Sequence, residues 1–184
     1  MQSRVDEFRS LITPLIVKPE KLKRYGSVGD GGYVLPINAV KKSTFLISGG
    51  IENNNNFELS LARLGIVGIQ IDNSIDTAPI LHKNLSFIRA TLGNILEVNI
   101  DELITRFPAK SSGILKLDIE GAEYSVFTAI KNIDKFNIIV VEFHSLYKIS
   151  NDDFWSNFRL ILLKLRKNHE VVFIAPNNCC MLVR

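Results

Sequence analysis

Cysteine is scarce in this chain of 184 residues: there are only two, Cys179 and Cys180, and they are neighbours. The geometry of a structural disulfide is hard to meet between adjacent residues. The paired cysteine spacings of zinc sites are absent as well. The fold must therefore depend on a hydrophobic core, and a chain of this length can form one within a single domain.

Long apolar runs are also absent. The runs "FNIIVV" and "LILL" are far shorter than the roughly 20 residues that a transmembrane helix needs. The N-terminal stretch "MQSRVDEFRS" contains no apolar core of a signal peptide. These features predict a cytoplasmic protein without a membrane span.

Charge of one sign does not dominate. The chain has 22 Lys and Arg against 19 Asp and Glu, a formal net charge of +3. A nucleic-acid-binding domain normally has a stronger basic bias, and the basic group within Lys18–Arg24 is explained by an exposed loop or helix face. We therefore expect no nucleic-acid partner.

From residue 44 onward, two kinds of segment alternate. Near-continuous apolar segments of strand length occur at 44–48, 65–72, 86–92, 112–119, 136–143, 170–175 and 180–183. Amphipathic segments of helical period occur at 55–64, 77–85, 99–107, 122–133 and 151–169. Strands that are apolar on both sides indicate a parallel sheet covered on both faces. We therefore predict an α/β fold with a doubly wound, mostly parallel sheet.

Polar residues mark the expected starts of the helices. Asn55, Thr77, Asn99 and Asn151 each stand where an N-cap is needed. Glu58 follows Asn55 at capping-box spacing. These residues therefore predict where the helices begin.

Residues 1–43 precede the alternation. Val5, Phe8 and Leu11 recur at helical spacing and predict a first helix. The sequence "GDGGYVLP" predicts a tight turn at 30–32 and a short extended piece after it. We expect 1–43 to pack on a core formed by 44–184, within one domain overall.

Polar and glycine residues follow each predicted strand. In a doubly wound sheet, ligands bind beyond the carboxyl ends of the strands, so these positions are the candidate site. They are Gly49, Gly50, Glu52, Asn53, Asp72, Asn73, Gly93, Asn94, Asp118, Glu120, Glu123, Glu142 and His144.

Gly49 and Gly50 form a turn after the first strand of the alternation. Such a turn lets a ligand approach the backbone closely, or it simply allows the chain to turn sharply. The spacing is not that of the dinucleotide motif, and no phosphate-loop lysine follows, which argues against a nucleotide-dependent oxidoreductase. Glu52 would repel a phosphate and suits an ammonium or another cation instead.

Asp72 ends the second strand of the alternation. An acid at this position can accept hydrogen bonds from ribose hydroxyls, although an Asx turn with Asn73 is a local alternative. A glycine turn after one strand and an acid after the next together favour an adenosine ligand without a pyrophosphate.

Three carboxylates, Asp118, Glu120 and Glu123, gather in the sequence "LDIEGAE". Carboxylates at one strand end are costly unless they bind a cation, a positive ligand or a proton, although Glu123 also suits the first turn of a helix. His144 stands beside Glu142 at the next strand end, where a neutral imidazole can accept a hydroxyl proton.

The sequences "GDGGYVL", "SGGIENNNNFELSLA", "LKLDIEGAEYSVF", "VVEFH" and "PNNC", in this order, resemble the FkbM-type family of S-adenosylmethionine-dependent methyltransferases. The resemblance runs from Gly29 to the C-terminus. It implies a class I methyltransferase fold, Rossmann-like, with a final antiparallel strand. Because the chain ends soon after "PNN", the C-terminal hairpin is expected to be shortened.

The resemblance also implies roles for the candidate residues. Cofactor-binding positions would be Gly49, Gly50, Glu52, Asn53, Asp72, Asn73, Gly93, Asn94 and Asp118. Catalytic positions would be His144, Asp118 and Glu120, and acceptor-binding positions Glu142, His144 and Asp30. His144 is the first choice of base and Asp118 the second. No metal is assigned, although a divalent ion on Asp118, Glu120 and Glu142 would offer another way to acidify a hydroxyl.

The expected activity is O-methylation, with S-adenosylmethionine as cofactor, of a hydroxyl on a small-molecule acceptor such as a carbohydrate or glycan precursor. The alternative is a non-catalytic domain of the same fold that binds the cofactor only. Within the asparagine run, Asn53 is assigned to the ligand and Asn55 to the helix cap, while Asn54 and Asn56 are assigned to the loop.

Overall fold

The centre of the protein is a parallel sheet. The computed structural model describes residues 2–93 and 98–175. The strands of the sheet are β3 (Phe45–Gly49), β4 (Val67–Ile71), β5 (Leu85–Ile88), β6 (Gly113–Leu117) and β7 (Phe136–Val141). Their order is β5-β4-β3-β6-β7, and each neighbouring pair is parallel. Within the sheet, the chain therefore begins at the central strand β3, proceeds to the β5 edge and then proceeds from β6 to the β7 edge. This confirms the predicted doubly wound α/β fold.

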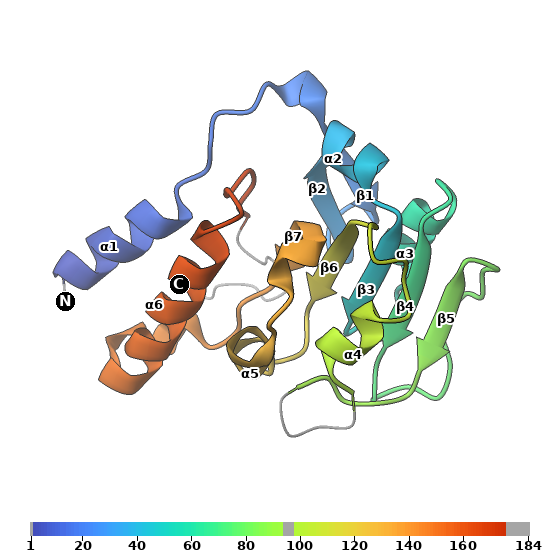
Figure 1. Ribbon diagram of the computed structural model, residues 1–184. Coiled ribbons are helices and arrows are strands. Elements are labelled where there is room, and N and C mark those ends of the chain that lie inside the picture. Colours follow the sequence, from blue (N-terminus) through green and yellow to red (C-terminus); the bar gives the residue numbers. More distant parts are fainter. Residues whose placement is uncertain (1, 94–97, 176–184) are drawn as a thin grey trace.

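Helices and a separate hairpin surround the sheet (Figure 1). The helices are α1 (Gln2–Ile12), α2 (Ile37–Lys42), α3 (Asn56–Ala62), α4 (Ile100–Ile104), α5 (Glu123–Ala129) and α6 (Asp152–Arg166). Short 3-10 helices are η1 (Pro19–Lys21), η2 (Ile133–Lys135) and η3 (Leu146–Ser150). The strands β1 (Leu22–Gly26) and β2 (Gly32–Pro36) form an antiparallel hairpin. In the described residues, no helix is both long and apolar enough to cross a membrane.

Both faces of the sheet are buried, as the continuous apolar strands predict. Side chains such as Phe45 and Ile47 point to one face, where α4, α5 and α6 cover them. Leu46 and Ile114 point to the other face, where they pack against α3 and the hairpin. Side chains of a strand alternate between the faces, so a strand with two covered faces is mostly apolar on both sides.

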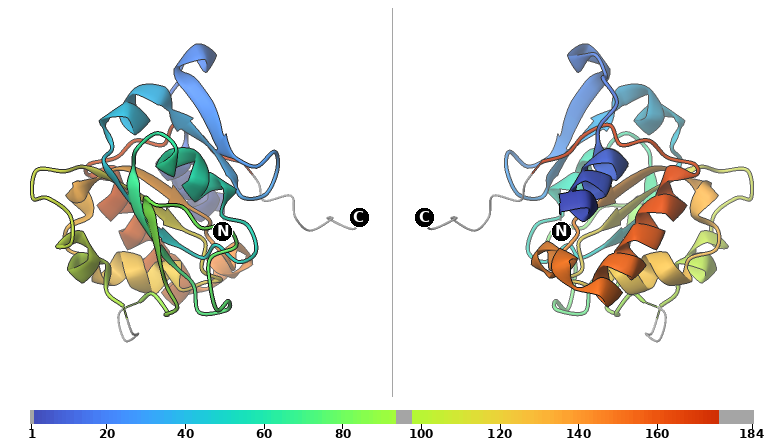
Figure 2. Two further views of the ribbon diagram at one scale, coloured as in Figure 1. Left: turned by 90° about the vertical axis from the view of Figure 1, so that its right-hand side faces the viewer. Right: turned by 90° about the vertical axis from the view of Figure 1, so that its left-hand side faces the viewer.

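The two ends of segment 1–43 pack in different places. Helix α1 lies beside α6, where Phe8 and Leu11 contact a cluster around Phe158 (Figure 2). The hairpin instead packs on α3, and its Tyr33 ring meets Phe57 edge-on at a centroid distance of 4.9 Å. Lys23 and Arg24 of the basic group are exposed, as expected, but they lie on strand β1 and not on a loop or helix.

Two expected elements do not form. Segment 77–85 is not a helix: residues 77–84 form bends and a turn, and Thr77 caps nothing. Ala78 is buried there but Leu81 is 79% exposed, so the segment has no continuous apolar stripe to bury. Residues 170–175 are not a strand, and the backbone of 171 only accepts one hydrogen bond, from Leu15. The segment at 180–183 and the shortened hairpin lie outside the described residues.

Candidate active site

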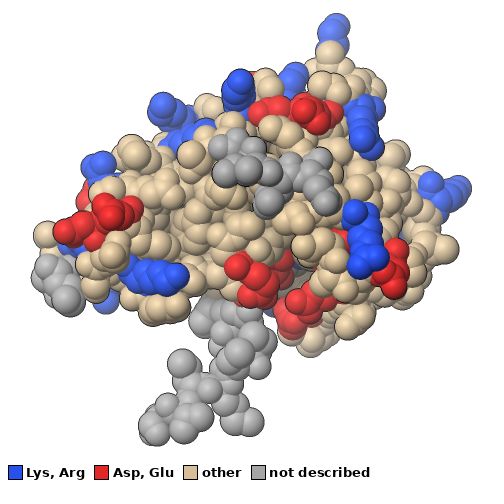
Figure 3. Space-filling view, turned by 90° about the horizontal axis from the view of Figure 1, so that it is seen from below, with Lys and Arg blue, Asp and Glu red and all other residues tan. Residues whose placement is uncertain are grey.

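The turns that follow β3, β6 and β7 are joined by backbone hydrogen bonds. Asp118 donates from its backbone to Gly49 O at 3.1 Å, and Glu142 donates to Leu117 O at 2.9 Å. The chain segments that carry Gly50, Asp118 and His144 therefore meet at the carboxyl edge of the sheet, as expected. Figure 3 looks onto this side of the molecule, where acidic side chains form several groups.

Left-handed backbone conformations occur at the same edge. Glu52, Glu120 and Ser145 have φ of 43°, 54° and 58°, and each lies just after a strand of the sheet. A non-glycine residue in this region typically costs about 1–3 kcal/mol, and such residues cluster at functional sites. The strained turns support the placement of a site at this edge.

Gly49, the last residue of β3, and Gly50, which follows it, allow close contact between strand ends. A Cβ on Gly50 would lie 1.6 Å from Asp118 O, and Gly50 has a φ of +74°. A Cβ on Gly49 would lie 2.5 Å from a methyl carbon of Leu92. Protein atoms therefore fill the space beside both glycines. This favours the interpretation that glycine is needed here for a sharp turn of the chain.

Asp72 holds that turn in place. Its Oδ2 accepts hydrogen bonds from the backbone of Ile51 at 2.8 Å and of Glu52 at 2.9 Å. Its Oδ1 accepts from the backbone and the hydroxyl of Ser74. Burial alone would raise the pKa of Asp72, but these hydrogen bonds outweigh it and lower the pKa. All of the roughly four acceptor positions of the carboxylate are thus used within the protein. The neighbouring Asn73 donates to Thr91 at 2.9 Å.

His144 is the centre of the candidate site. Its Nδ1 lies 2.6 Å from Oε1 of Glu123. Its Nε2 lies 3.8 Å from Asp118, 3.6 Å from Glu120 and 3.8 Å from Glu142. The structure thus brings together the four residues that the sequence assigned to catalysis and acceptor binding at these strand ends.

Glu123 orients the imidazole. Its side chain is fully buried at the start of α5, and the same Oε1 accepts from the backbone of Ile119 at 3.1 Å. A carboxylate only accepts, so Nδ1 carries the proton and Nε2 of the neutral ring is left as an acceptor. The sequence counted Glu123 among the three carboxylates, but its partner lies 21 residues away on another strand end. No local spacing could have revealed this pair.

The charges around His144 change its proton affinity. Burial by itself lowers the pKa of His144. The hydrogen bond and the charge of Glu123, with the charges of Glu120 and Glu142, outweigh burial and raise the pKa above its ordinary value. The imidazole is therefore a stronger base than a free histidine.

Two residues that sequence reasoning missed contact Asp118. Lys116 lies on β6, is 5% exposed in its side chain, and places Nζ 3.6 Å from Asp118 Oδ2. Its Nζ also donates to the carbonyls of Gly49 and Gly50. The Tyr33 hydroxyl donates to the same Oδ2 at 3.3 Å. Burial and then the charge of Asp118 raise the pKa of Tyr33, so it stays a neutral donor.

The hairpin and the asparagine run hold each other. Asn54 and Asn56 both donate to the Ser27 hydroxyl, at 3.1 and 3.0 Å. Asn54 also donates to the backbone carbonyl of Asp30 at 3.4 Å, while the Asp30 carboxylate accepts from the adjacent backbone of residue 31. In the described residues, no hydrogen bond or ion pair joins Asp30 to the His144 group. Asn53 is exposed.

The predicted capping box at the start of α3 is wrong. Asn55 is the N-cap residue but its side chain makes no capping bond. Its Nδ2 instead donates to Gln70 at 2.9 Å and to Ile80 O at 2.8 Å. Glu58 is buried and accepts from the Ser48 hydroxyl at 2.5 Å. Tertiary partners have replaced the local ones. The caps at Asn99 and Asn151 are confirmed, since each accepts a helix backbone hydrogen bond.

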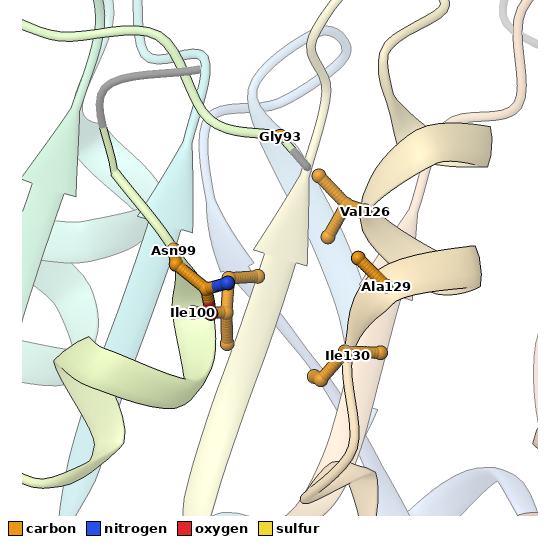
Figure 4. Close-up of a pocket in the computed structure, with 6 residues that line it drawn as sticks. All are labelled: Gly93, Asn99, Ile100, Val126, Ala129 and Ile130. Atoms are coloured by element: carbon orange, nitrogen blue, oxygen red, sulfur yellow. The ribbon is translucent and has the colours of Figure 1, made fainter. Parts of the chain in front are cut away.

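Gly93 is the last described residue before the gap at 94–97. It borders a hollow of about 10 Å³ whose walls come from the start of α4 and from α5 (Figure 4). The hollow is lined by Gly93, Asn99, Ile100, Val126, Ala129 and Ile130. This volume holds about one water molecule and is too small for an adenine ring. Asn94 lies outside the described residues.

A larger hollow of about 280 Å³ lies at the opposite edge, where β3 and β7 begin. Phe45, Phe107, Asp101 and Lys135 contribute to its wall. Asp101 accepts backbone hydrogen bonds and Lys135 donates to a carbonyl, so their polar atoms already have protein partners. The chemistry of the chain therefore points to the carboxyl edge instead.

The His144 group also has the composition of a cation site. Asp118, Glu142 and His144 each offer one ligand atom, and these atoms lie within 4.8 Å of one another. Carboxylate and imidazole ligands suit divalent ions such as Mn²⁺. The same set of atoms equally suits an organic cation or a proton.

Comparison with protein-family models matches residues 20–171 to the methyltransferase FkbM domain. Searches of curated proteins and of solved structures found no match. The matched range covers most of the chain and includes the hairpin, the glycine turn and the His144 group. This chain therefore belongs to the FkbM family of methyltransferases.

Proposed function

We propose that the protein transfers a methyl group from S-adenosylmethionine to a hydroxyl oxygen of a small-molecule acceptor, of the carbohydrate or glycan-precursor class. The observation that carries the proposal is the Glu123–His144 pair, with Nδ1 on a buried carboxylate and Nε2 directed at the strand ends. Such a pair is the arrangement that removes a proton from a hydroxyl.

The negative charges at the carboxyl edge of the sheet complement the positive charges of the cofactor. S-adenosylmethionine carries an ammonium and a sulfonium group, and Glu52, Asp118 and Glu142 place carboxylates at this edge. We assign the methionine half to Gly49, Gly50, Glu52, Asn53 and Asp118. We assign the ribose to Asp72 and Asn73, and the adenine to the side of Gly93 and Asn94. Ribose hydroxyls would replace some of the donors that Asp72 now holds.

S-adenosylmethionine, when held by the residues assigned above, would supply an electrophilic methyl group to the hydroxyl oxygen of the acceptor. His144 accepts the hydroxyl proton on Nε2. General base catalysis of this kind typically raises a reaction rate by roughly 10²–10⁴-fold. Asp118, Glu120 and Glu142 stabilise the imidazolium that results. Glu142 and Asp30 would also accept hydrogen bonds from other hydroxyls of the acceptor.

Positioning is the second contribution of the protein. Orienting two reactants at near-attack distance is worth up to about 7–11 kcal/mol of the barrier. Here Glu123 fixes the imidazole, and Lys116 and Tyr33 fix Asp118. These supporting groups lie on a helix and strands, which place functional side chains more accurately than loops do.

Ligand-induced stabilisation tests the proposal. We expect S-adenosylhomocysteine to raise the thermal unfolding temperature and NADH to leave it unchanged. At a hundredfold excess over Kd a true ligand adds about 2.7 kcal/mol to the free energy of unfolding. A shift with NADH alone would overturn the proposal, as would no shift with S-adenosylhomocysteine. Methyl transfer from labelled cofactor to a saccharide extract then separates an enzyme from a domain that only binds.

A further inference from the structure

We propose that the acidic edge, meaning Asp118, Glu120 and Glu142 around His144, selects the cofactor by charge. It favours the positively charged methyl donor over the neutral S-adenosylhomocysteine that remains after transfer. The inference rests on the proposed function, and it concerns what these side chains do before and after the chemical step.

The first support is the convergence of the carboxylates. Asp118, Glu120 and Glu142 reach within 3.6–3.8 Å of one imidazole nitrogen from the ends of two strands. A positive charge within about 4–6 Å of a carboxylate stabilises the charged form of that carboxylate. S-adenosylmethionine brings a sulfonium charge to the point of methyl transfer, whereas S-adenosylhomocysteine brings an uncharged thioether.

The second support is the position of Lys116, the cation beside Asp118. Lys116 Nζ lies 3.6 Å from Asp118 Oδ2, and its side chain is only 5% exposed. Its Nζ is engaged by the carbonyls of Gly49 and Gly50. Tyr33 contributes a neutral hydroxyl. Lys116 therefore offsets part of the charge of Asp118 from inside the protein, while the side chain of Glu120 is 79% exposed.

The third support is a buried carboxylate whose bonding is incomplete. Glu123 is 0% exposed, and its side chain reaches His144 through Oε1. Among the described residues its Oε2 has no hydrogen-bond partner. A buried charge is costly unless it is paired. Its negative charge adds to that of the acidic edge and increases the demand for a positive charge beside His144.

Isothermal titration calorimetry with three ligands tests the proposal. They are S-adenosylmethionine, S-adenosylhomocysteine and sinefungin, in which a carbon bearing an amine replaces the methyl-bearing sulfur. At low salt we expect both cationic ligands to bind about tenfold more tightly than S-adenosylhomocysteine. Because surface charges are screened, added salt should reduce that ratio.

Variants locate the cause of the preference. Glu142→Gln and Asp118→Asn should reduce the ratio about threefold or more, mainly through the cationic ligands. Glu120→Gln is the variant least disturbing to the fold, because Glu120 is 79% exposed. Asp134→Asn is the matched control, since it removes the same charge from an exposed position before β7, at the opposite edge.

Each outcome decides the matter. Equal affinities of the wild-type protein for all three ligands would overturn the inference and leave the proposed function standing. A preference that survives in all three carboxylate variants, or that falls equally in Asp134→Asn, would assign it to another part of the molecule. Failure of every ligand to bind would overturn the proposed function and the inference together.

Discussion

His144 and Glu123 form a pair in which Nδ1 and Oε1 are 2.6 Å apart, although they come from the end of β7 and the start of α5. The carboxylate is fully buried and the imidazole is partly exposed. The pair thus has a protected side that sets the proton position and an open side that faces Asp118, Glu120 and Glu142.

The pKa of His144 should lie above the ordinary histidine value of 6.5. Its raised pKa in the folded state stabilises the fold at pH values below the unfolded pKa. That contribution is lost as the pH rises through the folded pKa. Titration of the imidazole by NMR measures the shift directly. In Glu123→Gln the pKa should fall, while exposed Glu102→Gln should leave it unchanged. An unchanged pKa in Glu123→Gln would contradict the role of the pair.

Gly50→Ala should lower the free energy of unfolding by about 2 kcal/mol or more, because it combines backbone strain with a clash against Asp118 O. Gly65→Ala is the matched control: Gly65 has a φ of +93°, and a Cβ there meets nothing within 4 Å. It should cost only the left-handed conformation, roughly 1–2 kcal/mol. Equal losses in urea denaturation would show that β3 and β6 do not require this close approach.

Asn55 should act as an amide donor and not as a helix cap. Asn55→Ala leaves the buried Gln70 side chain without its donor and should cost about 1–3 kcal/mol. Asn55→Asp separates the two roles, because aspartate caps helices well but cannot donate to Gln70 or Ile80. We expect both variants to be destabilised in urea denaturation. Full stability of Asn55→Asp would restore the capping interpretation.

Asn53→Ala should keep full stability and weaken cofactor binding.

Asp72 should make the fold sensitive to acid. Its lowered pKa stabilises the protein above the unfolded value of 3.8, and this contribution is lost as the pH falls through the folded pKa. Asp72→Asn replaces an acceptor oxygen with an amino group facing the donors of residues 51, 52 and 74. We expect lower stability at neutral pH and a smaller further loss on acidification. A variant as acid-sensitive as the wild type would argue against this role.

Removal of divalent ions should not abolish methyl transfer if His144 Nε2 accepts the proton. The measurement is label transfer to a saccharide extract before and after dialysis against EDTA. A loss that Mg²⁺ or Mn²⁺ reverses would instead make Asp118, Glu142 and His144 a metal centre, which their spacing within 4.8 Å permits.

The order of strands and helices follows from the sequence because its physical causes are local. Strands such as Phe45–Gly49 are mostly apolar without alternation, which a sheet covered on both faces explains. The caps at Asn99 and Asn151 likewise depend on residues two or three positions away. The gathering of Asp118, Glu120, Glu142 and His144 could be predicted because parallel strands end at the same edge.

Other features depend on partners that are distant in sequence, and only the tertiary structure decided them. Residues 77–85 have helical spacing, yet residues 77–84 form bends and a turn and Leu85 begins β5. Asn55 and Glu58 have the spacing of a capping box, yet Gln70 and Ser48 offer them buried partners. The asparagines of the run thus have different partners, and the composition of the run could not predict which partner each one has.

The sequence by itself determined which residues stand at the carboxyl edge, since alternation of strand and helix sets that placement residue by residue. The tertiary structure decided what each of them does there. Glu123 meets His144, and Lys116 meets Asp118 and the glycine turn, through side chains that approach across the sheet. Hydrogen bonds and charges act over a few ångströms in space, and the chain must fold before such distances exist.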